Sequence, residues 1–198
     1  MKRALFIVLM VFASIVEAQP QQRKLAVGDT AFCGIVFYVK DSIGKQWVLV
    51  CAMQDEGSRV KWNNGNYRRT RAIHDSIFGK ANADQVIVKQ GPVGRYAANI
   101  CRFAPAADRM CNDSTRWYLP SRAELKIMFD SLAKTNKVKF AKEGYWSSVE
   151  RAPLDTMALR RSTERKAWIV DFLNGRAILN DKANKYNVRA IKEEINFF

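Results

Sequence analysis

Histidine is almost absent from this sequence: His74 is the only one, and none of the four cysteines belongs to a Cys-x-x-Cys pair. Structural zinc sites use cysteine and histidine ligands at such short spacings, so the sequence does not predict a zinc site. A Ser-His-Asp hydrolase would have to use His74, and no serine stands in a nucleophile-elbow motif. We therefore expect a protein that is not an enzyme, has no cofactor and carries His74 on a surface loop.

Long apolar runs are also scarce, and the one marked example spans residues 4–15. Lys2 and Arg3 precede it, and small residues at positions 16 and 18 stand before Gln19, which is the pattern of a secretory signal peptide. The run is shorter than the roughly 20 apolar residues that a membrane-spanning helix needs. We expect residues 1–18 to be a signal peptide, no later membrane span, and export to the periplasm, the outer-membrane surface or the extracellular space.

Acidic residues are outnumbered, because 19 Asp and Glu stand against 33 Lys and Arg, a formal net charge of +14. A large positive charge raises the local concentration of anionic partners and speeds their association. The expected partner is an anionic glycan or another polyanion, or an acidic protein of the cell envelope, rather than a specific nucleic acid. The alternative is that the charge only keeps the protein soluble.

Four cysteines follow the expected signal peptide, at positions 33, 51, 101 and 111. An even number of cysteines in an exported chain favours disulfides. Cys101 and Cys111 flank a predicted loop and form the preferred pair, which leaves Cys33 and Cys51 as a cross-strand pair. Either of the latter two could instead be a buried thiol, because cysteine packs well in protein cores.

Apolar and β-branched residues predict strands near both ends of the chain and helices between them. The predicted strands are residues 32–39, 46–53, 145–149, 167–173, 176–179 and 187–191. The predicted helices are residues 78–90, 94–103 and a third that begins at Ser121, where Ser121 and Glu124 fit a capping box. Residues 54–71 are predicted to be a loop, and Asn174-Gly175 a hairpin turn.

This order of elements predicts an α+β fold, in which the N-terminal and C-terminal strands meet in one antiparallel sheet and two or three helices lie between them. We expect residues 30–198 to form a single domain and residues 19–29 to be a disordered lead-in. Trp117, Trp146 and Trp168 lie in predicted strands or beside the capped helix and are expected in the core. Glu193 and Glu194, near the end of the chain, are expected to be solvated.

A set of short motifs in a fixed order makes the chain similar to a known family. The motifs are Phe32-Cys33-Gly34-Ile35-Val36-Phe37-Tyr38-Val39, Gly79-Lys80-Ala81-Asn82, Tyr96-Ala97-Ala98, Trp117-Tyr118-Leu119-Pro120-Ser121, Tyr145-Trp146-Ser147-Ser148, Ala167-Trp168, Asn174-Gly175 and Val188-Arg189. In order and spacing they resemble the domain at the C-terminus of Legionella collagen-like protein, a kind common in exported proteins of Bacteroidetes. The resemblance implies a C-type lectin-like fold. The named member of the family is associated with binding sulfated glycosaminoglycans, which agrees with the basic charge of this chain.

Two activities found on related folds are not expected here. Calcium-dependent lectins gather oxygen ligands from a Glu-Pro-Asn loop and a Trp-Asn-Asp motif, and Trp62-Asn63-Asn64 is only a loose counterpart. Formylglycine-generating enzymes need cysteines late in the chain, and none follows Cys111. We therefore expect no metal site and no redox chemistry.

Two basic stretches supply the candidate ligand-binding residues. The first comprises Arg59, Lys61, Trp62, Tyr67, Arg68, Arg69 and Arg71, and the second Arg160, Arg161, Arg165 and the neighbouring Lys166. Arginine matches sulfate, phosphate and carboxylate oxygens with two hydrogen bonds, and aromatic rings beside it could stack on a sugar. The long loops of a lectin-like fold gather on one side, so we expect one joint patch; the alternative is two separate solvated loops.

Taken together, the sequence predicts an exported, non-enzymatic module that binds an anionic ligand through basic loops. The alternative is a structural or accessory subunit of a cell-envelope complex.

Overall fold

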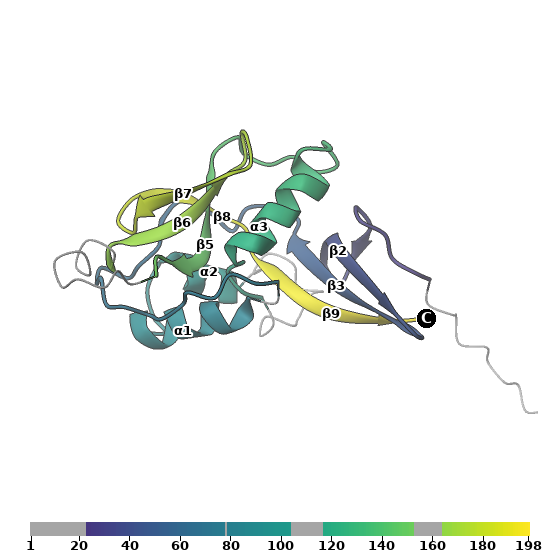
Figure 1. The fold of residues 1–198 in the computed structure, drawn as a ribbon, viewed down its shortest axis with the longest axis horizontal. Coiled ribbons are helices and arrows are strands. Elements are labelled where there is room, and N and C mark those ends of the chain that lie inside the picture. The colour runs from purple at the N-terminus through teal and green to yellow at the C-terminus, as the bar shows by residue number, and fades with distance from the viewer. Residues whose placement is uncertain (1–22, 78, 104–116, 153–163) are drawn as a thin grey trace, which may run out of the picture.

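The computed structural model describes residues 23–77, 79–103, 117–152 and 164–198. These residues form an α+β fold in which two sheets lie toward opposite ends of the molecule (Figure 1). Helix α3 (Arg122–Met128) lies between the sheets and contacts β2 of the first and β5 of the second. Helices α1 (Lys80–Gln90) and α2 (Ala97–Arg102) pack beside the second sheet.

The first sheet joins the two ends of the chain, as the sequence predicts. Its strands are β1 (Thr30–Ala31), β2 (Gly34–Ser42), β3 (Lys45–Ala52) and β9 (Ile191–Phe197), in the order β1-β2-β3-β9. The predicted hairpin of β2 and β3 is confirmed, with Gly44 in its turn at φ 69°. Strand β9 pairs antiparallel with β3 over its whole length, from Cys51 opposite Ile191 to Lys45 opposite Phe197.

Within the described residues, the second sheet has five strands. Its strands are β4 (Gly57–Lys61), β5 (Gly144–Glu150), β6 (Lys166–Asp171), β7 (Arg176–Asp181) and β8 (Lys185–Val188), in the order β4-β8-β5-β6-β7. The hairpin of β6 and β7 around Asn174-Gly175 is confirmed, and Gly175 adopts the φ of 73° that such a turn requires.

Two predicted segments are corrected here. The predicted loop of residues 54–71 contains β4, which pairs with β8. The predicted strand of residues 187–191 is instead the end of β8 and the start of β9, in different sheets. Arg189 makes this corner, because its side chain donates to the Ala52 carbonyl and pairs with Asp55, both at 2.8 Å.

The predicted helices are present, with shifted starts. Helix α1 ends before Gly91, and α3 begins at the predicted capping box: Glu124 N–H donates to the Ser121 hydroxyl at 3.1 Å, and Ser121 N–H donates to the Glu124 carboxylate at 2.7 Å. The helix continues as the π-helical turn η1 (Phe129–Ala133). Trp117 and Trp146 are buried as predicted, whereas Trp168 is half-buried beneath the Arg122 guanidinium.

Part of the expected disordered lead-in is ordered against the first sheet. The Gln46 side chain accepts from Leu25 N–H at 2.7 Å and donates to its carbonyl at 3.1 Å, and Asn196 donates to the Arg23 carbonyl at 3.0 Å. These buried amides need partners, and the backbone of residues 23–25 supplies them. The expectation of disorder is therefore wrong for residues 23–29, while residues 19–22 and the expected signal peptide lie outside the described residues.

Both predicted disulfide pairings are wrong, because Cys51 and Cys101 are free, buried thiols. Cys51 lies in β3 between two neighbouring strands, and Cys101 lies on the buried side of α2. Burial raises the pKa of Cys51 to about 11, although Arg189 opposes the rise, and burial also raises the pKa of Cys101. Cys33 is disulfide-bonded, and Cys111 lies outside the described residues.

Candidate functional site

Arg59 and Lys61 of the first basic stretch lie in β4, and the stretch continues beyond that strand as residues 62–72. Trp62 N–H donates to the Lys182 carbonyl at 3.1 Å, and the Trp62 indole donates to the Ser147 carbonyl at 2.8 Å. Farther along, Glu150 N–H donates to the Ala72 carbonyl at 2.8 Å. These bonds hold both ends of residues 62–72 against the second sheet.

A buried ion pair helps to fix the C-terminal end of the same loop. Glu150, the last residue of β5, lies 2.8 Å from the Lys182 ammonium, and their side chains are 1% and 0% exposed. The other Glu150 oxygen accepts the N–H groups of Thr70 at 3.0 Å and Arg71 at 2.6 Å. Burial lowers the pKa of Lys182, although Glu150 opposes that shift. One buried carboxylate therefore holds both the ammonium and the backbone that carries the arginines.

Trp62 is not a ligand-stacking residue, and that prediction is wrong. Its side chain is fully buried, and the Lys182 ammonium lies 4.5 Å from its ring centroid. The ring therefore attracts a cation of the protein itself, and cation–π attraction is stronger where the cation is desolvated. Trp62 therefore does make a cation–π contact, but the cation is Lys182 of the same protein and not a basic residue of 59–71.

Tyr67 and Arg165 come from the two predicted basic stretches, and the structure brings them together. The Arg165 guanidinium carbon lies 4.3 Å from the Tyr67 ring centroid, and its Nε pairs with Asp181 at 3.2 Å. Burial favours a higher pKa for Asp181, but the Ala183 N–H and the Arg165 guanidinium hold that pKa below its ordinary value. The two stretches therefore meet at the end of β7, although part of the charge of Arg165 is used by Asp181.

Arg69 and Arg71 line a pocket of about 360 Å³ together with Ile73, His74 and Gln85. None of the described residues that form its wall is acidic. The Arg69 Nη2 atom is buried and has no hydrogen-bond partner. The wall therefore holds two guanidinium groups and no carboxylate among its described residues.

The remaining predicted residues lie outside this pocket's wall. Arg68 is exposed on the same loop, and His74 is exposed as predicted. Arg59 and Lys61 are exposed on the edge strand β4, where Lys61 stands opposite Lys185 of β8. Arg160 and Arg161 fall outside the described residues.

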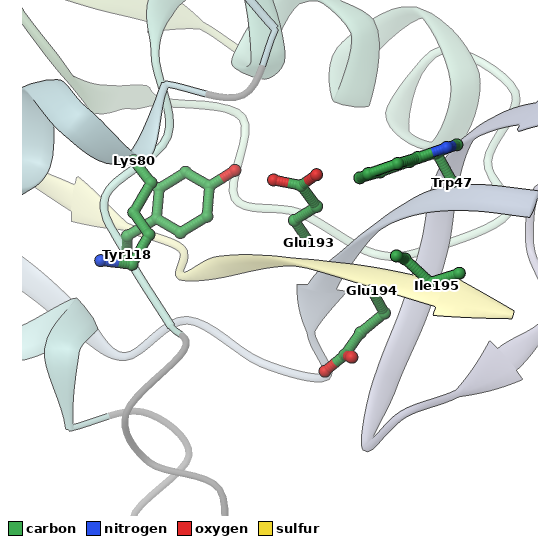
Figure 2. Close-up of a pocket in the computed structure, with 6 residues that line it drawn as sticks. All are labelled: Trp47, Lys80, Tyr118, Glu193, Glu194 and Ile195. Atoms are coloured by element: carbon green, nitrogen blue, oxygen red, sulfur yellow. The ribbon is translucent and has the colours of Figure 1, made fainter.

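A second pocket, of about 230 Å³, carries no residue of the predicted site (Figure 2). Its lining residues are Trp47, Lys80, Tyr118, Glu193, Glu194 and Ile195. The expectation that Glu193 and Glu194 are solvated is wrong: Glu194 is 9% exposed and pairs with Lys192 at 2.9 Å, and Glu193 is half-buried. Both lie on β9, where strand pairing to β3 and the neighbouring segments cover them.

Comparison with known proteins leaves the chemistry of these two pockets as the guide to function. No family model and no curated protein matches the chain. Within the described ranges, no three His, Cys, Asp or Glu side chains are grouped so that they could hold a metal ion. None of the helices in those ranges has the length and apolar character needed to cross a bilayer.

Proposed function

We propose that the protein is an exported, C-type lectin-like binding module that takes up an anionic group of a glycan or other polyanion at the Arg69–Arg71 pocket. The observation that carries the proposal is the composition of the pocket wall: two arginines, a histidine and a glutamine, with no acid among the described lining residues. The α+β fold with both chain ends in one antiparallel sheet agrees with the lectin-like part of the proposal.

The chemistry of the wall selects for oxyanions. Sulfate, phosphate and carboxylate oxygens accept paired hydrogen bonds from guanidinium groups, which are shorter and stronger than neutral ones. A neutral ligand would leave the guanidinium charges uncompensated while removing water from them.

The Glu150–Lys182 pair helps to position the arginine loop, and its carboxylate does not neutralise Arg69 or Arg71. Glu150 is buried and already bonded to Lys182 and to two backbone N–H groups, so its charge is compensated internally. The backbone on either side of Arg71 is thereby fixed before any ligand arrives. Binding then loses less conformational freedom than it would on a flexible loop.

The test is binding of a short sulfated heparin oligosaccharide, measured by calorimetry at several salt concentrations. The double variant Arg69→Ala/Arg71→Ala should bind at least about tenfold more weakly, because a hydrogen bond to a charged group contributes roughly 1.5–3 kcal/mol. Its affinity should also depend less steeply on salt, because fewer ions are released on binding.

The matched control is Lys134→Ala/Lys142→Ala, which removes the same charge from exposed positions outside the pocket. Control and wild type should bind alike. Equal losses in the two double variants would mean that only net charge matters, and the pocket proposal would then fail. Co-purification with one protein partner at high salt would instead favour the accessory-subunit alternative.

A further inference from the structure

The second pocket has the opposite electrostatic character to the first. Figure 2 shows the Glu193 carboxylate, the Tyr118 hydroxyl and the Trp47 ring on one side of β9, with Glu194 directed to the other side. Trp47 stands directly opposite Ile195 in the β3–β9 pairing, so the aromatic wall and the floor come from neighbouring strands. The pocket therefore presents an aromatic, partly apolar surface around one carboxylate.

Glu193 lacks a cation in the described part of the protein, although positive side chains are close by. The Lys80 ammonium pairs with Asp84 at 2.7 Å and points away from Glu193 in Figure 2. Lys192 pairs with Glu194 instead, at 2.9 Å. The Tyr118 hydroxyl donates its proton to Glu124 at 2.9 Å, so that proton is not available to Glu193.

The surroundings of Glu193 disfavour its charge. Burial raises the pKa of Glu193, and repulsion by Glu194 adds to the rise. Burial also raises the pKa of Tyr118 far above its ordinary value, with Glu124 and Glu193 contributing, so the phenol stays protonated. A positive group placed in the pocket would compensate the Glu193 carboxylate. Lys80 is the positive residue among those that line the pocket, and the Lys45 ammonium lies near the Trp47 ring.

We infer that this pocket binds an organic ammonium group, with Glu193 as its counter-ion and the Trp47 and Tyr118 rings as its walls. An anion would be repelled by Glu193, and a neutral ligand would bury the carboxylate further without compensating it. Aromatic faces attract ammonium groups by about 0.5–2 kcal/mol. The Trp47 ring already does so inside the protein, because the Lys45 ammonium lies 5.4 Å from its centroid.

The volume limits the size of the ligand. About 230 Å³ holds an alkylammonium head but not a long oligosaccharide. Such a head belongs to a small free amine or to a lysine side chain of a protein partner. Both share the same chemistry, and this inference does not depend on the anion pocket.

The experiment titrates the purified protein, in amine-free buffer, with n-butylammonium, with Nα-acetyl-lysine amide and with the neutral analogue n-butanol. The readout is the indole N–H signal of Trp47 in nuclear magnetic resonance spectra, assigned with Trp47→Phe. The two ammonium probes should give saturable shifts at millimolar concentration, and n-butanol should give none. Tighter binding of the lysine derivative would identify a protein lysine as the source, and tighter binding of butylammonium a free amine.

Glu193→Gln tests the counter-ion. This variant should bind the ammonium probes about tenfold more weakly, since a charged hydrogen bond is replaced by a neutral one. Asp130→Asn is the matched control, because it removes an exposed carboxylate that pairs with Lys126 elsewhere, and it should bind like wild type. Equal shifts with n-butanol, or unchanged binding by Glu193→Gln, would overturn the inference. The three probes are compared on the wild-type protein, so that comparison does not depend on whether a variant folds.

Discussion

Replacing Lys182 by methionine should reveal how strongly the arginine loop depends on a buried charge. The side chain of Lys182 is 0% exposed and that of Glu150 is 1% exposed, so solvent cannot compensate Glu150 once its partner is removed. Removing one member of such a pair costs about 3–5 kcal/mol of unfolding free energy. The carboxylate keeps the Thr70 and Arg71 N–H groups, which places the expected loss toward the lower end of that range.

The double variant Lys182→Met/Glu150→Gln separates the free-energy cost of the uncompensated Glu150 charge from the cost of the packing lost at position 182. A glutamine carbonyl can still accept the Thr70 and Arg71 N–H groups, while the buried negative charge is gone. The double variant should therefore be more stable than Lys182→Met alone. Urea denaturation followed by circular dichroism measures the unfolding free energies of the wild type, the two single variants and the double variant. The coupling between the two residues is calculated from this double-mutant cycle.

The reasoning would be refuted by a Lys182→Met variant whose unfolding free energy lies within about 1 kcal/mol of wild type, well below the expected loss of about 3–5 kcal/mol. A double variant less stable than the single one would refute it equally.

Two further predictions concern groups with raised pKa values. Cys51 and Cys101 should resist Ellman's reagent in the folded protein and react fully in denaturant, because both are buried and the pKa of Cys51 is raised to about 11; rapid reaction of the folded protein would contradict this placement. The raised pKa of Glu193 means that the native state holds its proton to higher pH than the unfolded chain, so its stabilising contribution is present at low pH and lost as pH rises. Glu193→Gln should therefore be slightly more stable than wild type at neutral pH and indistinguishable at acid pH, measured by thermal unfolding.

The parts of the fold that the sequence predicts well are those set by local chemistry. The capping box at Ser121 needs only two side chains three positions apart, and both of its hydrogen bonds form. The Asn174-Gly175 turn and the end of α1 before Gly91 likewise depend on glycine at a positive φ. These signals are contained within a few residues and do not require knowledge of distant partners.

The errors arise where a distant partner changes the meaning of a residue. Trp62 stands among basic residues in the sequence, but the cation over its ring is Lys182. The sequence prediction ends the last strand at Ile191, because the charged residues of β9 mask the alternation that continues to Ile195. The pairing of Lys192 with Glu194 allows those charges to be buried. The disulfide prediction used the cysteine count, the predicted loop between Cys101 and Cys111 and the adjacent predicted strands of Cys33 and Cys51. None of these shows that Cys51 and Cys101 are buried as free thiols.

The formal charge of +14 overstates the surface that is available to an anion. Lys182 and Arg189 are buried against Glu150 and Asp55, and the exposed Arg165 is paired with Asp181, so the charge of these cations is compensated within the protein. Arg69 and Arg71 differ, because in the described part of the chain they form no ion pair and face a wall without acids. The residues to test first are therefore chosen by their lack of internal counter-ions rather than by their density in the sequence. Glu193 is the corresponding case among the acidic residues. It has no positive partner in the described part of the chain, although the protein is rich in lysine and arginine.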